Sequence, residues 1–122
     1  MLKFENLDVY QKALLYIQSI YEITKSFPKD EKYGLTDQLR RASVSIAANI
    51  AEGSGRYHRK DYVQFLRMAR SSAYECIALL QISLNQKYVE KQKYNKFYSE
   101  LVIITKMISG LMNKLNEGNS NE

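Results

Sequence analysis

The sequence predicts an all-α fold, an antiparallel up-down-up-down four-helix bundle. Helix breakers are few, with five glycines and one proline in 122 residues. Apolar side chains recur at spacings of three and four in four successive segments, which is the period of an amphipathic helix. The connections between these segments are short, as expected between antiparallel neighbours. A chain of this length forms one domain, which we expect to span residues 1–116, followed by a disordered tail at residues 117–122.

The first two helices are expected at residues 6–26 and 35–52. The segment FPKDEKYG separates them, with Pro28 and Gly34 as breakers. Gly53, Ser54 and Gly55 follow the second helix and end it. The stripes expected to face the core are Leu7, Tyr10, Leu14, Ile17, Tyr21 and Thr24 in the first helix, and Leu35, Leu39, Ala42, Ile46, Ile50 and Gly53 in the second.

The other two helices are expected at residues 59–86 and 90–115. Cys76 lies on the apolar stripe of the first of these, where it is expected to be a small core side chain. The full stripes are Tyr62, Phe65, Ala69, Ala73, Cys76 and Leu80 in one helix, and Tyr94, Phe97, Leu101, Ile104, Ile108, Leu111 and Leu115 in the other.

The second helix has an unusual outer face. From Ala42 to Ala51 it carries no charge on any side, and a helix that is small or apolar all round is normally surrounded. We therefore expect a second copy of the chain to cover it. The alternative is that alanine and serine simply line a solvated face. The expected interface residues are Val44, Ala47, Ala48, Asn49, Ala51 and Glu52.

Polar side chains follow one line along the flank of the same helix. Asn49 and Glu52 need partners there, because an unpaired buried polar group costs about 1–3 kcal/mol. A hydrogen-bond network, with Glu52 pairing an arginine of the third helix or of a neighbour, is one interpretation. Direct contact with a ligand is the other. The line comprises Gln38, Arg41, Ser45, Asn49 and Glu52.

The positive charge of the chain is concentrated in its middle. All six arginines lie between positions 40 and 70, together with Lys60 and only two acids, Glu52 and Asp61. Seven cations and two acids give +5, which is the whole formal net charge of the chain. Arginine presents donors suited to phosphate, and an exposed tyrosine can stack on a base. The stretch therefore predicts a surface for RNA or DNA, although a solvated face, ion pairs between subunits or an acidic protein partner would also use it. The expected nucleic-acid-binding residues are Arg40, Arg41, Arg56, Arg59, Lys60, Arg67, Arg70 and Tyr74.

Several other classes of protein are disfavoured. One cysteine and one histidine, His58, leave no disulfide framework and no Cys/His zinc site. Glu52 has no second acid beside it for acid/base chemistry, and His58 lacks an arginine four to six residues away on one helix, as RNA-cleaving helical bundles typically need. We expect no enzymatic activity and no cofactor or metal. The first eight residues, MLKFENLD, include acids and no apolar run, so we expect no signal peptide. No apolar run approaches the roughly 18 residues of a membrane span, and we expect a cytoplasmic location without membrane contact.

Two segments carry a resemblance to a known family. They read YGLTDQLRRASVSIAANIAEGSGR and DYVQFLRMARSSAYE, and they resemble the four-helix-bundle family of 23S rRNA intervening-sequence proteins. The resemblance extends over nearly the whole chain, and its most specific element is NIAEG, residues 49–53, after an Arg-Arg pair. It implies a bacterial protein that forms a homopentamer and has no established enzymatic activity.

The accessory protein of diversity-generating retroelements is related to this family, which implies a similar pentameric fold that binds nucleic acid and a reverse transcriptase. Ala47 stands where members of the family commonly have proline, and Ser71 where glycine is frequent, so helix geometry at these positions is expected to differ.

Two functions remain open. One is a non-catalytic oligomer that binds RNA or DNA, and the other is a structural or adaptor oligomer that binds an acidic protein partner.

Overall fold

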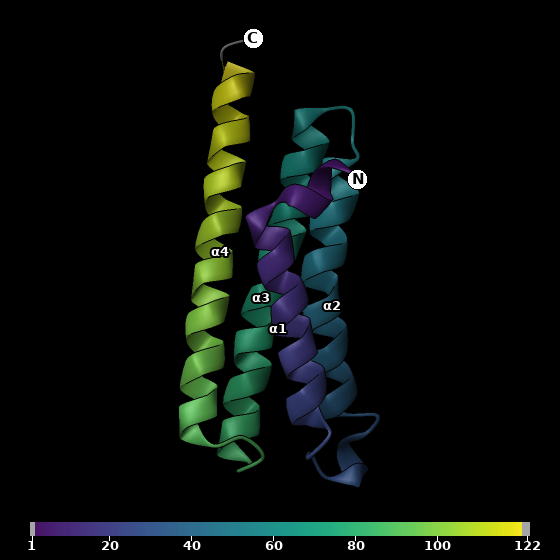
Figure 1. Cartoon of the computed structure of the whole chain (residues 1–122), viewed down its shortest axis with the longest axis vertical. Helices are drawn as coiled ribbons and strands as arrows, with labels where there is room; N and C mark the ends of the chain where they lie inside the picture. The colour runs from purple at the N-terminus through teal and green to yellow at the C-terminus, as the bar shows by residue number, and fades with distance from the viewer. Residues whose placement is uncertain (1, 121–122) are drawn as a thin grey trace.

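The protein folds as four long helices joined by short connections, as the sequence predicts (Figure 1). The structure is a computed structural model that describes residues 2–120. The 3₁₀ helices η1 (Lys3–Asn6) and η2 (Lys29–Glu31) lie before α1 and between α1 and α2. The four α-helices are α1 (Asp8–Thr24), α2 (Leu35–Ser54), α3 (Arg59–Asn85) and α4 (Lys91–Ser120).

The helices pack mainly on their neighbours in the sequence. Contacts are most extensive between α2 and α3, then between α3 and α4, and they are slight between α1 and α4. The α2–α3 turn and the C-terminal part of α4 lie at one end of the bundle, and the α1–α2 connection lies at the other (Figure 1). No helix within residues 2–120 combines the length and the apolarity needed to cross a bilayer.

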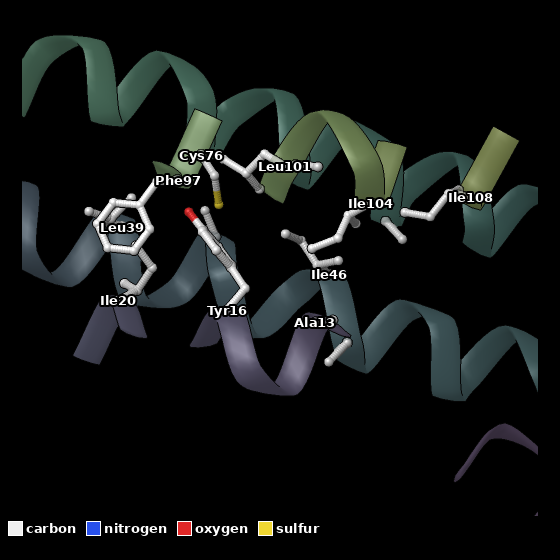
Figure 2. Packing of buried hydrophobic residues seen from close by; sticks show 14 of the residues in the cluster. Ala13, Tyr16, Ile20, Leu39, Ile46, Cys76, Phe97, Leu101, Ile104 and Ile108 are labelled. Carbon is white, nitrogen blue, oxygen red and sulfur yellow. The ribbon is translucent and has the colours of Figure 1, made fainter. Parts of the chain in front are cut away.

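All four helices contribute to a single core (Figure 2). The Tyr16 ring meets the Phe97 ring edge to face, with 6.1 Å between centroids, and so joins α1 to α4. The largest fully buried apolar side chains are Tyr16, Ile20, Leu39, Ile46, Ile50, Leu66, Leu80, Leu101, Ile104 and Ile108. The predicted core stripe of α2 is confirmed, because all six of its residues are buried.

The predicted stripe of α1 is wrong by part of a turn. The buried face consists of Val9, Ala13, Tyr16, Ile20 and Thr24, whereas the predicted Leu14 and Tyr21 are 37% and 41% exposed. Both rows satisfy the helical spacing. Thr24 belongs to both rows and is buried as predicted. The structure otherwise selects the row that contains the small residue Ala13, and the Arg40 guanidinium of α2 covers the Tyr21 ring.

The ends of two helices also differ from prediction. α2 continues through Gly53 to Ser54. The backbone N–H of Gly55 then donates to the Glu52 carbonyl and that of Arg56 to the Gly53 carbonyl, and these bonds end the helix. α4 continues to Ser120, beyond the predicted end at residue 115. Residues 117–120 of the predicted tail are therefore helical in backbone, and residues 121–122 lie outside the described residues.

Candidate nucleic-acid interface

The α2–α3 turn places several cations at one end of the bundle. α2 stops at Ser54, His58 adopts an extended conformation, and α3 begins at Arg59. Arg59, Lys60 and Arg67 are exposed on the first turns of α3. Together with Arg56 in the turn, these side chains form what we call the basic end: Arg56, Arg59, Lys60 and Arg67.

Arg56 is held in place by the structure around the turn. Its Nη2 atom lies 2.7 Å from Glu52 Oε1, and its guanidinium lies 4.6 Å from the centre of the Phe65 ring. The predicted partner of Glu52 was an arginine of the third helix or of another subunit, whereas the partner in the structure comes from the turn. An ion pair this exposed contributes about 1 kcal/mol or less to stability, and Glu52 offsets part of the charge that Arg56 brings to the surface.

Lys60 and Arg67 border a hollow between the start of α3 and the end of α4. The hollow has a volume of about 450 Å³. Arg67 Nη1 donates to Gln64 Oε1 at 2.8 Å, which holds the guanidinium along the helix. The hollow therefore presents two cations and two amide groups, with the Asp61 carboxylate beside them. The cations and amide groups supply donors of the kind that bind phosphate, and the carboxylate opposes an anion. The lining residues of the hollow are Lys60, Asp61, Val63, Gln64, Arg67 and Asn116.

Arg70 and Tyr74 lie further along α3. Arg70 is half-buried, and its Nη1 donates to Ser109 Oγ of α4 at 3.0 Å. This bond joins α3 to α4, so one of the guanidinium donors of Arg70 is already hydrogen-bonded within the bundle. Tyr74 is 55% exposed, but it lies seven residues from Arg67, about 10 Å along the helix axis.

Arg40 and Arg41 are not part of the basic end. Arg40 is half-buried and donates through Nε to Thr24 Oγ1 at 2.8 Å, which ties α2 to α1. Arg41 pairs with Asp37 one turn earlier, at 3.0 Å. Both lie about 20 Å from the α2–α3 turn along the helix axis. The single surface expected from residues 40–70 is therefore divided in two.

The residues predicted to form an interface on α2 differ in their exposure. Val44 is 41% exposed and Ala48 is exposed, whereas Ala47 is buried within the chain itself at 6% exposure. Asn49 is half-buried and donates to the Ser45 carbonyl and hydroxyl, and Ser72 of α3 donates to the same hydroxyl at 2.9 Å. Ala47 and Asn49 thus serve the fold of the chain itself, while Val44 and Ala48 face outward.

Tyr57 is a residue of this region that the sequence reasoning did not single out. It is 94% exposed, and its ring meets the His58 ring edge to face at 5.0 Å between centroids. The signal available in the sequence was its place between Arg56 and Arg59 in a turn, where no core contact is expected.

Two ionisable side chains, Cys76 and Tyr16, are fully buried in the core. Cys76 is fully buried, and this burial raises the pKa of its thiol to about 12, which keeps the group protonated at neutral pH. The Tyr16 hydroxyl points toward the Cys76 sulfur (Figure 2), and burial raises the pKa of this phenol above its ordinary value. Within the part of the chain that the structure describes, no three His, Cys, Asp or Glu side chains gather to hold a metal ion.

Comparisons with known proteins place the chain in one family. Residues 5–110 match the family model described as 23S rRNA-intervening sequence protein. The chain is also similar in structure to a crystal structure from Bacteroides thetaiotaomicron, described as a protein with unknown function from the S23 ribosomal protein family. The TM-score is 0.79 at 22% identity, over 86% of this chain and 95% of that chain. No curated protein sequence matches significantly.

Proposed function

Because the chain belongs to the 23S rRNA-intervening sequence protein family, we propose that it is a non-catalytic homo-oligomer that binds RNA or DNA through the phosphate backbone. The observation that carries this proposal is the basic end. Its four cations lie within a short stretch of the α2–α3 hairpin, at one end of the bundle (Figure 1). The chain outside residues 40–70 has equal numbers of cations and acids.

Electrostatic attraction of this kind favours nucleic acid over a neutral partner. Each phosphate neutralised by a lysine or arginine releases condensed counterions, so affinity falls steeply with salt. No base-reading motif accompanies the cations, and we therefore propose weak sequence preference. Repetition of the basic end in a homopentamer, the assembly implied by the family resemblance, would multiply the same surface and strengthen binding.

Replacing Lys60 and Arg67 together with glutamine tests the proposal. Both side chains are exposed and neither joins two helices, so the fold should be unchanged. Arg70 is left in place because its bond to Ser109 joins α3 to α4. We expect weaker binding at about 50 mM salt and a slope of log K against log salt that falls by roughly 0.7–0.9 for each lost phosphate contact. Fluorescence anisotropy with a labelled oligonucleotide measures both quantities.

A control variant replaces Lys12 and Lys96 with glutamine. These lysines line a separate hollow of about 260 Å³ between α1 and α4, so the change in net charge is the same. The control should retain most of the affinity. Equal binding by Lys60→Gln/Arg67→Gln and the parent protein would show that the basic end is not the binding surface. Dissociation of that variant into monomers would instead assign the cations to subunit ion pairs and favour the adaptor function, with an acidic protein partner.

A further inference from the structure

Among the tyrosines and phenylalanines of the described residues, Tyr57 has the most exposed side chain. It is 94% exposed, compared with 84% for Tyr33 and 55% for Tyr74. An aromatic ring buries a large apolar area when it packs, and Tyr57 leaves nearly all of that area in water. The ring therefore has a free face for a partner from outside the chain.

The surroundings of Tyr57 indicate the chemistry of that partner. Arg56 precedes the ring and Arg59 and Lys60 follow His58, so the ring lies inside the basic end. α3 begins at Arg59, and the N-terminus of a helix carries partial positive charge that favours anions. A partner that combines phosphates with flat aromatic groups meets both features, and nucleic acid has this chemistry.

The accessible ring further distinguishes one form of nucleic acid from another. Bases inside a duplex are stacked on each other, so a protein ring can reach a base face only where the base is unpaired. We propose, on the basis of the function proposed above, that Tyr57 stacks on an unpaired base while cations of the basic end hold the adjoining phosphates. The protein therefore prefers single strands, loops or single-stranded ends over uninterrupted duplex.

Replacing Tyr57 with alanine tests the stacking contact. The probes are an oligothymidylate of about 15 nucleotides, a length near the upper limit of one ssDNA-binding module, and a blunt duplex of the same length. Loss of one base stack should weaken single-strand binding by roughly 5- to 100-fold. Duplex binding and the salt slope should change little, because no cation is removed. Tyr57→Phe keeps the ring and should bind like the parent protein.

Tyr33→Ala is the matched control. Tyr33 is 84% exposed and lies in the α1–α2 connection at the opposite end of the bundle (Figure 1). A solvent-exposed ring is therefore removed in both variants, and general effects on folding or solubility should be shared. Only Tyr57→Ala should lose single-strand affinity.

A fluorescent variant provides a direct measurement of stacking. The chain contains no tryptophan, so Tyr57→Trp introduces a single reporter at this position. Its emission should be quenched by oligothymidylate and much less by the duplex, whereas the emission of Tyr33→Trp should respond to neither probe.

The outcomes separate this inference from the proposed function. If the parent protein binds both probes equally, or if Tyr57→Ala binds oligothymidylate like the parent, the stacking inference is wrong while phosphate binding stands. If the parent protein binds neither probe at about 50 mM salt, the proposed function fails and the inference fails with it.

Discussion

Gly53 lies at a point where the backbones of α2 and α3 come close together. A Cβ atom at this position would lie 2.8 Å from Phe65 Cβ and 3.0 Å from Tyr62 Cδ1. Real Cβ contacts are not this short, so the helices could not keep their separation. The glycine in the NIAEG segment therefore serves the packing of the hairpin that carries the basic end.

Replacing Gly53 with alanine should destabilise the protein. The added methyl group overpacks the α2–α3 contact, and we expect a loss of about 1–3 kcal/mol in the free energy of unfolding, measured by urea denaturation. Gly110→Ala is the control, because a Cβ atom there meets nothing within 4 Å and a helical alanine is favoured over glycine by about 1 kcal/mol. Equal effects of the two substitutions would contradict this account of Gly53.

Cys76 and Tyr16 place two ionisable groups in the core. Burial raises the pKa of the Cys76 thiol to about 12 and also raises that of the Tyr16 phenol. Both groups are neutral when protonated, so the folded chain holds these protons more tightly than the unfolded chain does. Their contribution to stability is complete below the unfolded pKa values and is lost as the pH rises toward the folded ones.

The Cys76→Ala variant should isolate the contribution of the thiol. Above the unfolded thiol pKa, near 8.5, the parent protein should lose up to about 1.4 kcal/mol per pH unit through this group. The variant should lose correspondingly less, so the difference in stability between the two proteins should narrow from pH 9 toward pH 12. Urea denaturation across this range measures it, and parallel pH profiles would contradict the prediction.

Among the helices, α2 has different roles on its different faces. Its core face packs on the bundle, its Arg40 and Ser45 side chains bond to groups on α1 and α3 respectively, and Val44 and Ala48 point outward. Val44 and Ala48 lie one turn apart and form a small uncharged strip on this side of the helix. The proposed homo-oligomer would cover this strip.

Ala48→Glu tests the assembly. In a monomer the new carboxylate would lie in solvent and have little effect, whereas in a packed interface it would be desolvated and strongly unfavourable. We expect particles of lower mass by light scattering at an unchanged helix content by circular dichroism. Ala78→Glu places the same charge on an exposed position of α3 and should keep the parent mass. An unchanged mass for Ala48→Glu would refute the assignment of this face to the interface.

At the scale of the whole molecule, charge and packing are both unevenly distributed. The cations of the basic end gather at the α2–α3 turn, and the weakest helix contact lies between α1 and α4. A hollow remains at that contact, with Leu15 and Ile103 among its lining residues. The α2–α3 hairpin therefore combines the most extensive packing with the proposed binding surface, which holds the cations on a rigid support.

The fold class, the four helices and most of the core could be predicted from the sequence. The reason is that helical periodicity alone gives the positions of core residues such as Ile46 and Ile50 in α2, or Leu101 and Ile104 in α4. The sequence also located the net charge between residues 40 and 70. Periodicity could not choose between two overlapping apolar rows in α1, because both satisfy the same spacing.

The division of that charge over the surface depends on how the helices pack. Arg40 and Arg70 bond to side chains of neighbouring helices, whereas Lys60 and Arg67 border a surface hollow, although the sequence presents all four as similar cations. Helix packing likewise buries the side chain of Ala47 and leaves that of Tyr57 exposed. The physical reason is that exposure depends on which helices pack together and how each is rotated, and these contacts join residues that lie far apart in the chain.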